Sequence, residues 1–156
     1  MKPGRNSAFA ALCVAAIGCS LPHDAEDSLS HIKNGSMRVG VSTNPPWVAT
    51  AGDTISGYEG TIVGELAHQL HSRIEAHPGA ESVLLQQLHD RKLDMVVGGI
   101  TSDSRWKKDV ALTRAYHKDR GGKQHVLALP PGENAWLVRV EEYLHDNEAR
   151  LKAIPE

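Results

Sequence analysis

The sequence predicts an α/β fold, in which a mostly parallel sheet is flanked by helices and receives one antiparallel return strand. Two short apolar runs, Arg38–Ser42 and Leu93–Val97, each lead into a small polar loop. Segments with the apolar spacing of helices lie between them, and this alternation favours parallel pairing. Because parallel strands end at the same edge of a sheet, we expect the two loops to form two sides of one ligand pocket.

Length and composition limit what else the chain can be. Its 156 residues provide one domain with one core. The net charge of −2, with both signs intermixed, lacks the basic stripe of nucleic-acid-binding proteins, so we predict no nucleic-acid partner. Both cysteines, Cys13 and Cys19, lie near the N-terminus. The rest of the chain therefore has neither an internal disulfide nor a thiolate metal site.

The N-terminus is typical of a secretion signal. Lys2 and Arg5 precede an apolar run, residues 8–17, that is too short to span a bilayer. Ala16-Ile-Gly-Cys19 resembles the lipobox of bacterial lipoproteins, which implies a signal peptide over residues 1–18 and lipidation of Cys19, with plain secretion as the alternative. Ser20 then favours the outer membrane of a Gram-negative envelope. Residues 19–36 are rich in polar residues, Pro and Gly, and predict a flexible tether.

The first half of the domain, which begins at residue 37, alternates strands and helices. After the strand at 38–42, Pro45-Pro46 ends the pairing because proline lacks an N–H donor. Helical spacing of apolar residues follows over 62–74, and a second strand is expected at 73–77. Ser82 is expected to cap a helix that leads to the strand at 93–97.

The second half predicts a hairpin and a long helix. A polar helical turn at 102–108 and an extended segment at 110–116 come first. Gly121-Gly122 then favours a tight reversal, after which residues 124–129 return as an antiparallel strand. Asn134 is expected to cap a final helix whose apolar stripe extends to residue 151. The domain thus covers residues 37–152, and residues 153–156 form a tail.

Five motifs along the chain point together to one family. They are Met37-Arg-Val-Gly-Val-Ser42, Asn44-Pro-Pro-Trp47, Gly57-Tyr-Glu59, Asp94-Met-Val-Val-Gly-Gly-Ile-Thr101 and Thr113-Arg-Ala-Tyr116. In this order they resemble the first lobe of bacterial extracellular solute-binding proteins of family 3, the polar amino-acid receptors of ABC transporters. The resemblance implies a type II periplasmic-binding-protein fold with hinge strands at 113–116 and 124–129. Because Lys118–Lys123 stands where the second lobe is inserted, we predict a single lobe.

The resemblance also implies uncharged ligand residues in the strand-end loops. Trp47 is expected to form an aromatic wall for the solute, or else a lid over the edge of the core, and Asn44 lies in the same loop. Gly99 and Thr101 follow the second apolar strand. The backbone N–H of Gly99 and the hydroxyl of Thr101 are expected to bind an anionic group of the solute. Alternatively, these residues form an ordinary strand-to-helix turn.

Three charged residues complete the candidate site. Arg105 lies near the position where the family carries an arginine that binds the ligand carboxylate, although it follows Thr101 by four residues rather than five. Its alternative is a solvated surface charge. Arg114, beside the hinge, is a further candidate. Glu59 matches an acidic position of the family, or serves as a carboxylate at the start of a helix.

These features predict a binding module and no enzyme. No nucleophile elbow or Walker loop occurs in the sequence, and no cofactor is implied. Glu65, His68 and His71 share a helix face but lack the further ligands of a metal site. We expect a periplasmic, lipid-anchored lobe that weakly binds a small polar solute, with an ABC permease as its partner. The alternative is an interaction module whose open half-cleft is covered by a second copy of the chain or by an envelope protein.

Overall fold

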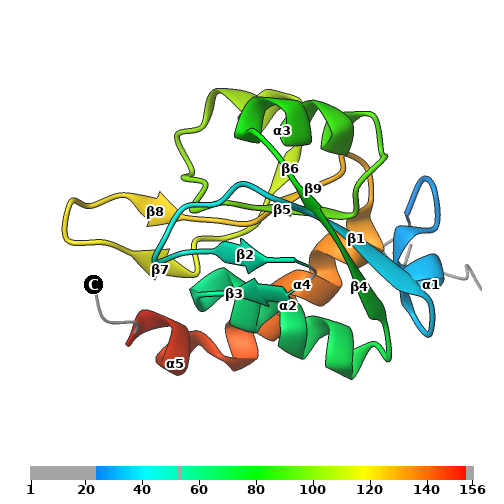
Figure 1. The fold of residues 1–156 in the computed structure, drawn as a ribbon, viewed down its shortest axis with the longest axis horizontal. Helices are drawn as coiled ribbons and strands as arrows, with labels where there is room; N and C mark the ends of the chain where they lie inside the picture. Colours follow the sequence, from blue (N-terminus) through cyan, green and yellow to red (C-terminus); the bar gives the residue numbers. More distant parts are fainter. Residues whose placement is uncertain (1–23, 53, 154–156) are drawn as a thin grey trace, which may run out of the picture.

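The centre of the fold is a five-stranded sheet in the order β4-β1-β5-β9-β6 (Figure 1). In the computed structural model, which describes residues 24–52 and 54–153, β1 (Ser36–Val41) pairs in parallel with β4 (Arg73–Pro78) and β5 (Met95–Val97). The return strand β9 (Ala128–Leu129) pairs antiparallel with β5 and with β6 (Ala111–Leu112). This arrangement confirms the predicted fold class.

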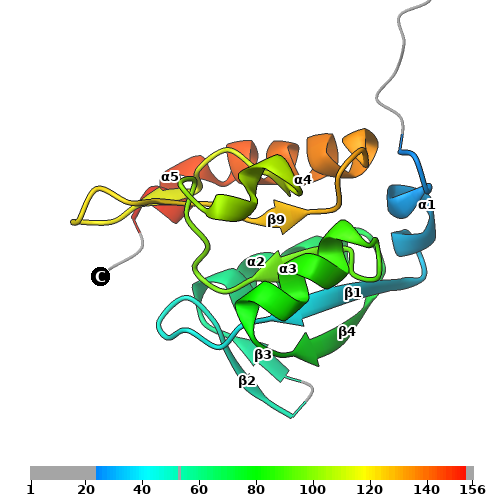
Figure 2. The ribbon, with the colours of Figure 1, turned by 90° about the horizontal axis from the view of Figure 1, so that it is seen from above.

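Helices cover both faces of the sheet. On one face lie α2 (Tyr58–Gln69), α4 (Asn134–Asp146) and the short α5 (Glu148–Lys152); on the other lie α3 (Glu81–His89) and the 3-10 helix η1 (Arg105–Lys108) (Figures 1 and 2). Within β5, Met95 and Val97 face the first set of helices and Val96 faces the second, as the period of two in a strand requires.

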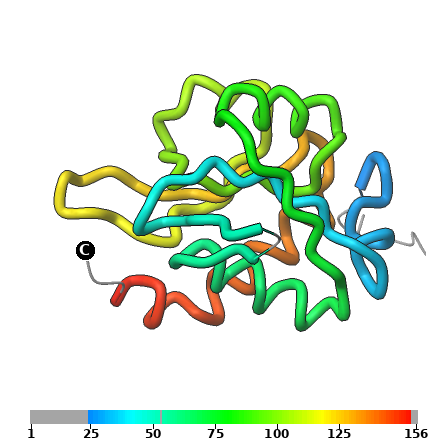
Figure 3. The backbone as a smooth tube through the Cα atoms, viewed as in Figure 1, coloured from blue at the N-terminus to red at the C-terminus, as the bar shows by residue number. Residues whose placement is uncertain are grey.

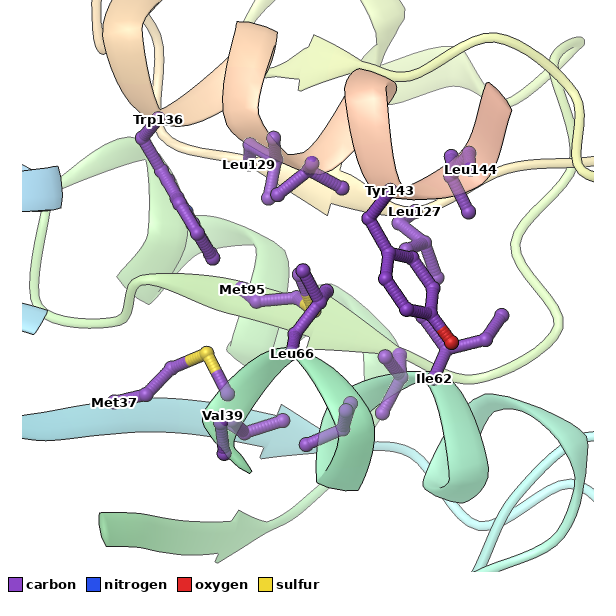
Figure 4. Close-up of a cluster of buried hydrophobic side chains, with 14 of the residues drawn as sticks. Met37, Val39, Ile62, Leu66, Met95, Leu127, Leu129, Trp136, Tyr143 and Leu144 are labelled. Atoms are coloured by element: carbon purple, nitrogen blue, oxygen red, sulfur yellow. The ribbon is translucent and has the colours of Figure 1, made fainter. Parts of the chain in front are cut away.

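Most of the core lies between the sheet and the pair α2 and α4. Leu66 from α2 and Trp136 and Tyr143 from α4 meet strand residues such as Met95 there (Figure 4). Trp136 is fully buried, and its indole N–H donates to the backbone carbonyl of Asp94 at 2.8 Å. A smaller cluster fills the space beneath α3.

A hairpin lies where proteins of the resembled family insert a second lobe, as the prediction of a single lobe requires. β7 (His117–Lys118) and β8 (Gln124–His125) pair antiparallel, and the tube in Figure 3 shows their loop projecting from the body of the protein. Gly122 has a φ of 83°, which is the left-handed conformation that the predicted reversal needs. A second hairpin, β2 (Ala49–Ala51) with β3 (Thr54–Ser56), lies within the stretch that the sequence analysis left without regular structure.

The predicted tether is wrong for its described part, residues 24–36. This segment forms the helix α1 (Ser28–Ile32), and Ile32 is fully buried in the larger core cluster. Residues 1–23, with the predicted signal peptide and Cys19, lie outside the described residues.

Two buried carboxylates hold this segment in place. The Glu133 carboxylate accepts hydrogen bonds from the backbone N–H groups of Glu26 at 2.9 Å and Ser28 at 3.1 Å. The Asp24 carboxylate accepts from the N–H of Leu29 at 2.8 Å and of Trp136 at 2.9 Å. These side chains satisfy N–H groups at the starts of α1 and α4. Asp24, one of the acidic residues of the predicted tether, is therefore a capping group.

Several predicted boundaries also shift. The residues that precede α3 and α4 are Ala80 and Glu133, so the predicted caps Ser82 and Asn134 lie inside the helices. The last helix is divided at Asn147 into α4 and α5, and the predicted strand at 124–129 is divided into β8 and β9.

Two valines test the layered core. Val63 on α2 is fully buried, whereas Val83 on α3 is 55% exposed. We expect Val63→Ala to lower the free energy of unfolding by about 2–3 kcal/mol, because it removes buried methyl groups and leaves a cavity. Val83→Ala should change it by less than about 0.5 kcal/mol. Urea denaturation of both variants checks this; equal losses would contradict the arrangement of the core.

Candidate functional site

A buried carboxylate, Glu59, lies directly behind the strand-end loops. Glu59 is the second residue of α2, and its side chain is fully buried. One carboxylate oxygen accepts from the backbone N–H of Gly98 at 2.7 Å and of Gly99 at 3.0 Å, and the other accepts from the Tyr116 hydroxyl at 2.7 Å. Glu59 therefore joins α2, the loop after β5 and the segment before β7.

Burial governs the protonation of this group. Desolvation raises the pKa of Glu59 to about 7, although the hydrogen bonds from Gly99, Tyr116 and Gly98 act in the opposite direction. The pKa of Tyr116 is also raised, first by its own burial and then by the neighbouring Glu59 charge. Near neutral pH, Glu59 is therefore divided between its charged and neutral forms.

The N–H groups of Gly98 and Gly99, which the sequence analysis considered for a bound anion, are bonded to Glu59. Gly99 has a φ of 69°, and a Cβ there would lie 2.7 Å from both Asn44 Nδ2 and Trp47 Cδ1. Asn44 Nδ2 in turn donates to the Gly98 carbonyl at 2.9 Å. The loops after β1 and β5 are thus locked together by close contacts that require glycine.

Trp47 is the hub of an aromatic cluster in front of these loops. Its ring is stacked against the imidazole of His125, with 3.7 Å between centroids and 23° between planes. Tyr58, Tyr116 and His117 lie around it at 6.0, 6.3 and 5.5 Å. Trp47 is half-buried and also packs against the larger core. Trp47 thus packs over the edge of the core, and one of its faces is already covered; its role as a wall for a solute stays a prediction.

The residue that covers Trp47 was missed by the sequence analysis. His125 belongs to β8, its side chain is only 5% exposed, and its Nε2 lies 3.2 Å from the Asp119 carboxylate. The register of the hairpin pairs His125 with His117. That register could have been expected from the Gly121-Gly122 turn, and it places His125 beside the end of β5. Only the stacking against Trp47 required the three-dimensional fold.

The remaining predicted residues lie at the rim or beyond it. The Thr101 hydroxyl donates to the Asp103 carboxylate, and this bond lowers the pKa of Asp103. Arg105 begins η1 and is exposed; within the described part of the chain its side chain has no hydrogen bond or ion pair. Arg114 is instead held against α4, where its Nε donates to Glu141 at 2.7 Å.

The structure therefore divides the predicted site into three parts. Asn44, Trp47, Glu59 and Gly99 are in direct or shared contact, as their hydrogen bonds and packing show. Thr101 is bridged to His125, and Arg105 follows four residues later at the start of η1; we call these two residues the rim. Arg114 faces a hollow of about 440 Å³ beside α4 and does not join the other candidates. Among residues 24–52 and 54–153, no three metal-ligating side chains are grouped.

The fold and the loops at the ends of its strands define one lobe of a solute-binding receptor. The chain belongs to the bacterial extracellular solute-binding proteins, family 3, whose model matches residues 37–148. This family consists mainly of binding proteins for small solutes, and membership implies a periplasmic or extracellular location. A comparison with curated proteins found no match.

Solved structures show the same fold. A point mutant of the arginine-bound form of domain 1 from TmArgBP, the arginine-binding protein of T. maritima, is 24% identical, with 78% of this chain and 98% of that chain covered and a TM-score of 0.70. The substrate-binding protein of an amino-acid ABC transporter is 14% identical, with 75% and 97% covered and a TM-score of 0.64. An ancestral cyclohexadienyl dehydratase is 12% identical, with 78% and 90% covered and a TM-score of 0.67.

The raised pKa of Glu59 gives a prediction with a definite sign. Between pH 4.5, the ordinary value for glutamate, and about 7, the unfolded chain has released a proton that the folded chain keeps. Stability must therefore fall as pH rises through this window, by roughly 3 kcal/mol at most for this group. Glu59→Gln stays neutral and can still accept from the glycine N–H groups.

We expect the difference in the free energy of unfolding between wild type and Glu59→Gln to shift in favour of the variant as pH rises from 4.5 to 7. Urea denaturation across this range measures it. Glu75→Gln, at an exposed position on β4, is the control and should follow the wild type. A difference that does not vary with pH would contradict the assignment.

Proposed function

We propose that this protein is a single-lobe receptor for a small polar, amino-acid-like solute in the bacterial envelope. The observation that carries the proposal is the combination of an aromatic hub, Trp47, with the rim of Thr101 and Arg105, whose guanidinium has no partner among the described residues. A guanidinium suits a carboxylate because it donates two parallel hydrogen bonds. An amino-acid-like solute presents that carboxylate.

One lobe is sufficient for binding in a protein of this fold. The T. maritima comparison is a structure of domain 1 alone in an arginine-bound form, and this chain covers 98% of it. The likeness supports the idea that a lobe without its partner lobe retains a ligand. Formed pockets bury about 70–90% of a ligand, which a single wall does not achieve. We therefore propose weak binding, with a dissociation constant roughly between micromolar and millimolar.

A binding role fits the site better than catalysis does. Glu59 has the raised pKa that acid–base chemistry uses, but its carboxylate is fully buried and bonded to donors of the lobe itself. The interaction module is the second candidate. It receives less support, because it rests on Trp47 alone, whose ring is stacked on His125, whereas the receptor proposal also rests on the exposed guanidinium of Arg105.

We further propose attachment to the membrane through Cys19 and cooperation with an ABC permease. The support for the anchor is the lipobox-like Ala16-Ile-Gly-Cys19, and the support for the permease is family membership. No helix in the described ranges is long and apolar enough to cross a membrane. Acyl chains on Cys19 together with an amide-linked chain would provide the multiple attachment that stable anchoring needs.

Arg105 is the sharpest test of solute binding. Calorimetric and thermal-shift screens of amino acids should find a carboxylated solute that binds the wild type, and Arg105→Ala should abolish the binding without lowering the melting temperature of the unliganded protein. The reason is that the substitution removes the forked donor and no core volume. Lys108→Ala, another exposed cation of η1, is the control and should bind as the wild type does.

If Arg105→Ala still binds the solute, Arg105 is not part of the binding site. A wild type that binds no amino acid at millimolar concentration would contradict the receptor function. Mass measurement in solution belongs to the same experiment, because an assembly that dissociates in Trp47→Ala would favour the interaction module.

The anchor is tested by Cys19→Ala in the full-length chain. The thiol is the attachment point for the acyl chains, so the variant should lose its lipid mass and leave the membrane fraction or remain uncleaved. Cys13→Ala is the matched control and should fractionate as the wild type does. Unchanged fractionation of Cys19→Ala, with no lipid on the N-terminal peptide of the wild type, would contradict the anchor.

A further inference from the structure

The hairpin that stands in place of the second lobe brings a side chain onto the face proposed for the solute. We propose that His125 is an internal occupant of this face, that it competes with the solute for the ring of Trp47, and that it thereby sets the affinity of the receptor. The inference rests on the proposed function and adds to it a residue outside the family motifs.

The geometry of His125 is that of a bound planar group. Its ring lies 3.7 Å from that of Trp47 and nearly parallel to it, whereas the other aromatic neighbours of Trp47 are tilted or edge-on. Stacking of this kind uses the face of the indole, where a ligand would gain the most contact. His125 is 4% exposed, so its ring fills the space beside Trp47.

Asp119 fixes the occupant from within the same hairpin. One oxygen of its carboxylate accepts from the backbone N–H of Lys123 at 2.8 Å, and the other lies 3.2 Å from His125 Nε2. Because a carboxylate only accepts, Nε2 carries the hydrogen of this bond. The planar ring thus stacks on an aromatic face and donates an N–H to an acid, which is the chemistry that a nitrogen-bearing solute would use there.

The arrangement leaves His125 incompletely satisfied. Its other ring nitrogen, Nδ1, is buried without a hydrogen-bond partner in the described structure. A buried polar atom without a partner costs free energy, and native structures contain few such atoms. The cost lowers the free energy needed to move His125 aside, so a solute group that stacks on Trp47 and makes all its hydrogen bonds can replace the ring.

The occupant is carried by a short element. β7 and β8 contribute two residues each to their ladder, and β8 contacts the loop after β5 through the bond from Ser102 N–H to the Gln124 carbonyl at 2.9 Å. A backbone bridge also joins Thr101 to His125. His125 therefore lies next to the rim residue Thr101, in the place proposed for the solute. The imidazole must leave this place before the solute can enter it.

The test removes the occupant and supplies free imidazole as a probe. In His125→Ala, imidazole should fill the vacated place between Trp47 and Asp119, raise the melting temperature and quench the fluorescence of Trp47. In the wild type, imidazole should change neither the melting temperature nor the fluorescence. The variant Trp47→Phe identifies how much of the fluorescence signal comes from Trp47, because the chain contains three tryptophans. His68→Ala, at an exposed position on α2, is the matched control and should behave as the wild type does.

The amino acid that binds the wild type should bind His125→Ala more tightly, by about tenfold if the internal occupant fills the face in roughly nine molecules of ten. Equal or weaker binding in His125→Ala, with no response to imidazole, overturns the inference. If neither protein binds an amino acid, the proposed function fails, and an imidazole response confined to His125→Ala still supports internal occupancy. If His125→Ala does not fold, the affinity of His125→Gln for the amino acid decides, because glutamine keeps much of the side-chain volume but removes the aromatic ring from the stack.

Discussion

The buried Glu59 carboxylate is the constraint on which the rest of the lobe depends. A carboxyl group in this position is tolerable only when its oxygens are bonded, and the donors come from two segments far from α2 in sequence. Gly98 must follow β5 with its N–H turned toward Glu59, and Tyr116 must precede β7 with its hydroxyl beside the carboxylate. The hinge region is therefore fixed from inside the lobe. This explains how the domain keeps an ordered edge although nothing is inserted between β7 and β8.

With a hairpin in place of a second lobe, the ring of Trp47 needs another cover, and the aromatic cluster provides it. The loops after β1 and β5 would leave Trp47 open to water, and an exposed aromatic patch on a small domain favours association. The hairpin turns at Gly122, and its register brings His125 from β8 over the indole. The covering group is polar enough to bond Asp119 and flat enough to stack. The same few residues thus close the sheet edge and cover the face proposed for the solute.

The parts of the fold that follow from local patterns were predictable, and those that depend on distant partners were not. The apolar period identified β1, α2, β4, α3 and β5, and Gly121-Gly122 identified the hairpin, because each signal lies within a few residues. The segment at 24–36 appeared solvated because Asp24 and Glu133 reveal their capping role only when α1 and α4 meet. Likewise, the motifs named Trp47 and Glu59 as candidate site residues, but their contact partners, His125 and Tyr116, lie 78 and 57 positions away in the chain.

The candidate site has an inner part, the N–H groups of Gly98 and Gly99, and an outer part, the face of Trp47. Side chains of the lobe itself contact both parts. The N–H groups of Gly98 and Gly99 are bonded to a fully buried acid, and freeing them would strand a carboxylate in the core, so the inner part is closed to a solute. The Trp47 face is covered by a ring from a two-residue strand that leaves one nitrogen unsatisfied, so the outer part is held far less firmly. The proposed solute would therefore meet the lobe at Thr101 and Arg105, where the guanidinium is exposed. In the proposed receptor, recognition would then depend on side chains of the rim and the hairpin, because the backbone amides of Gly98 and Gly99 are already bonded to Glu59.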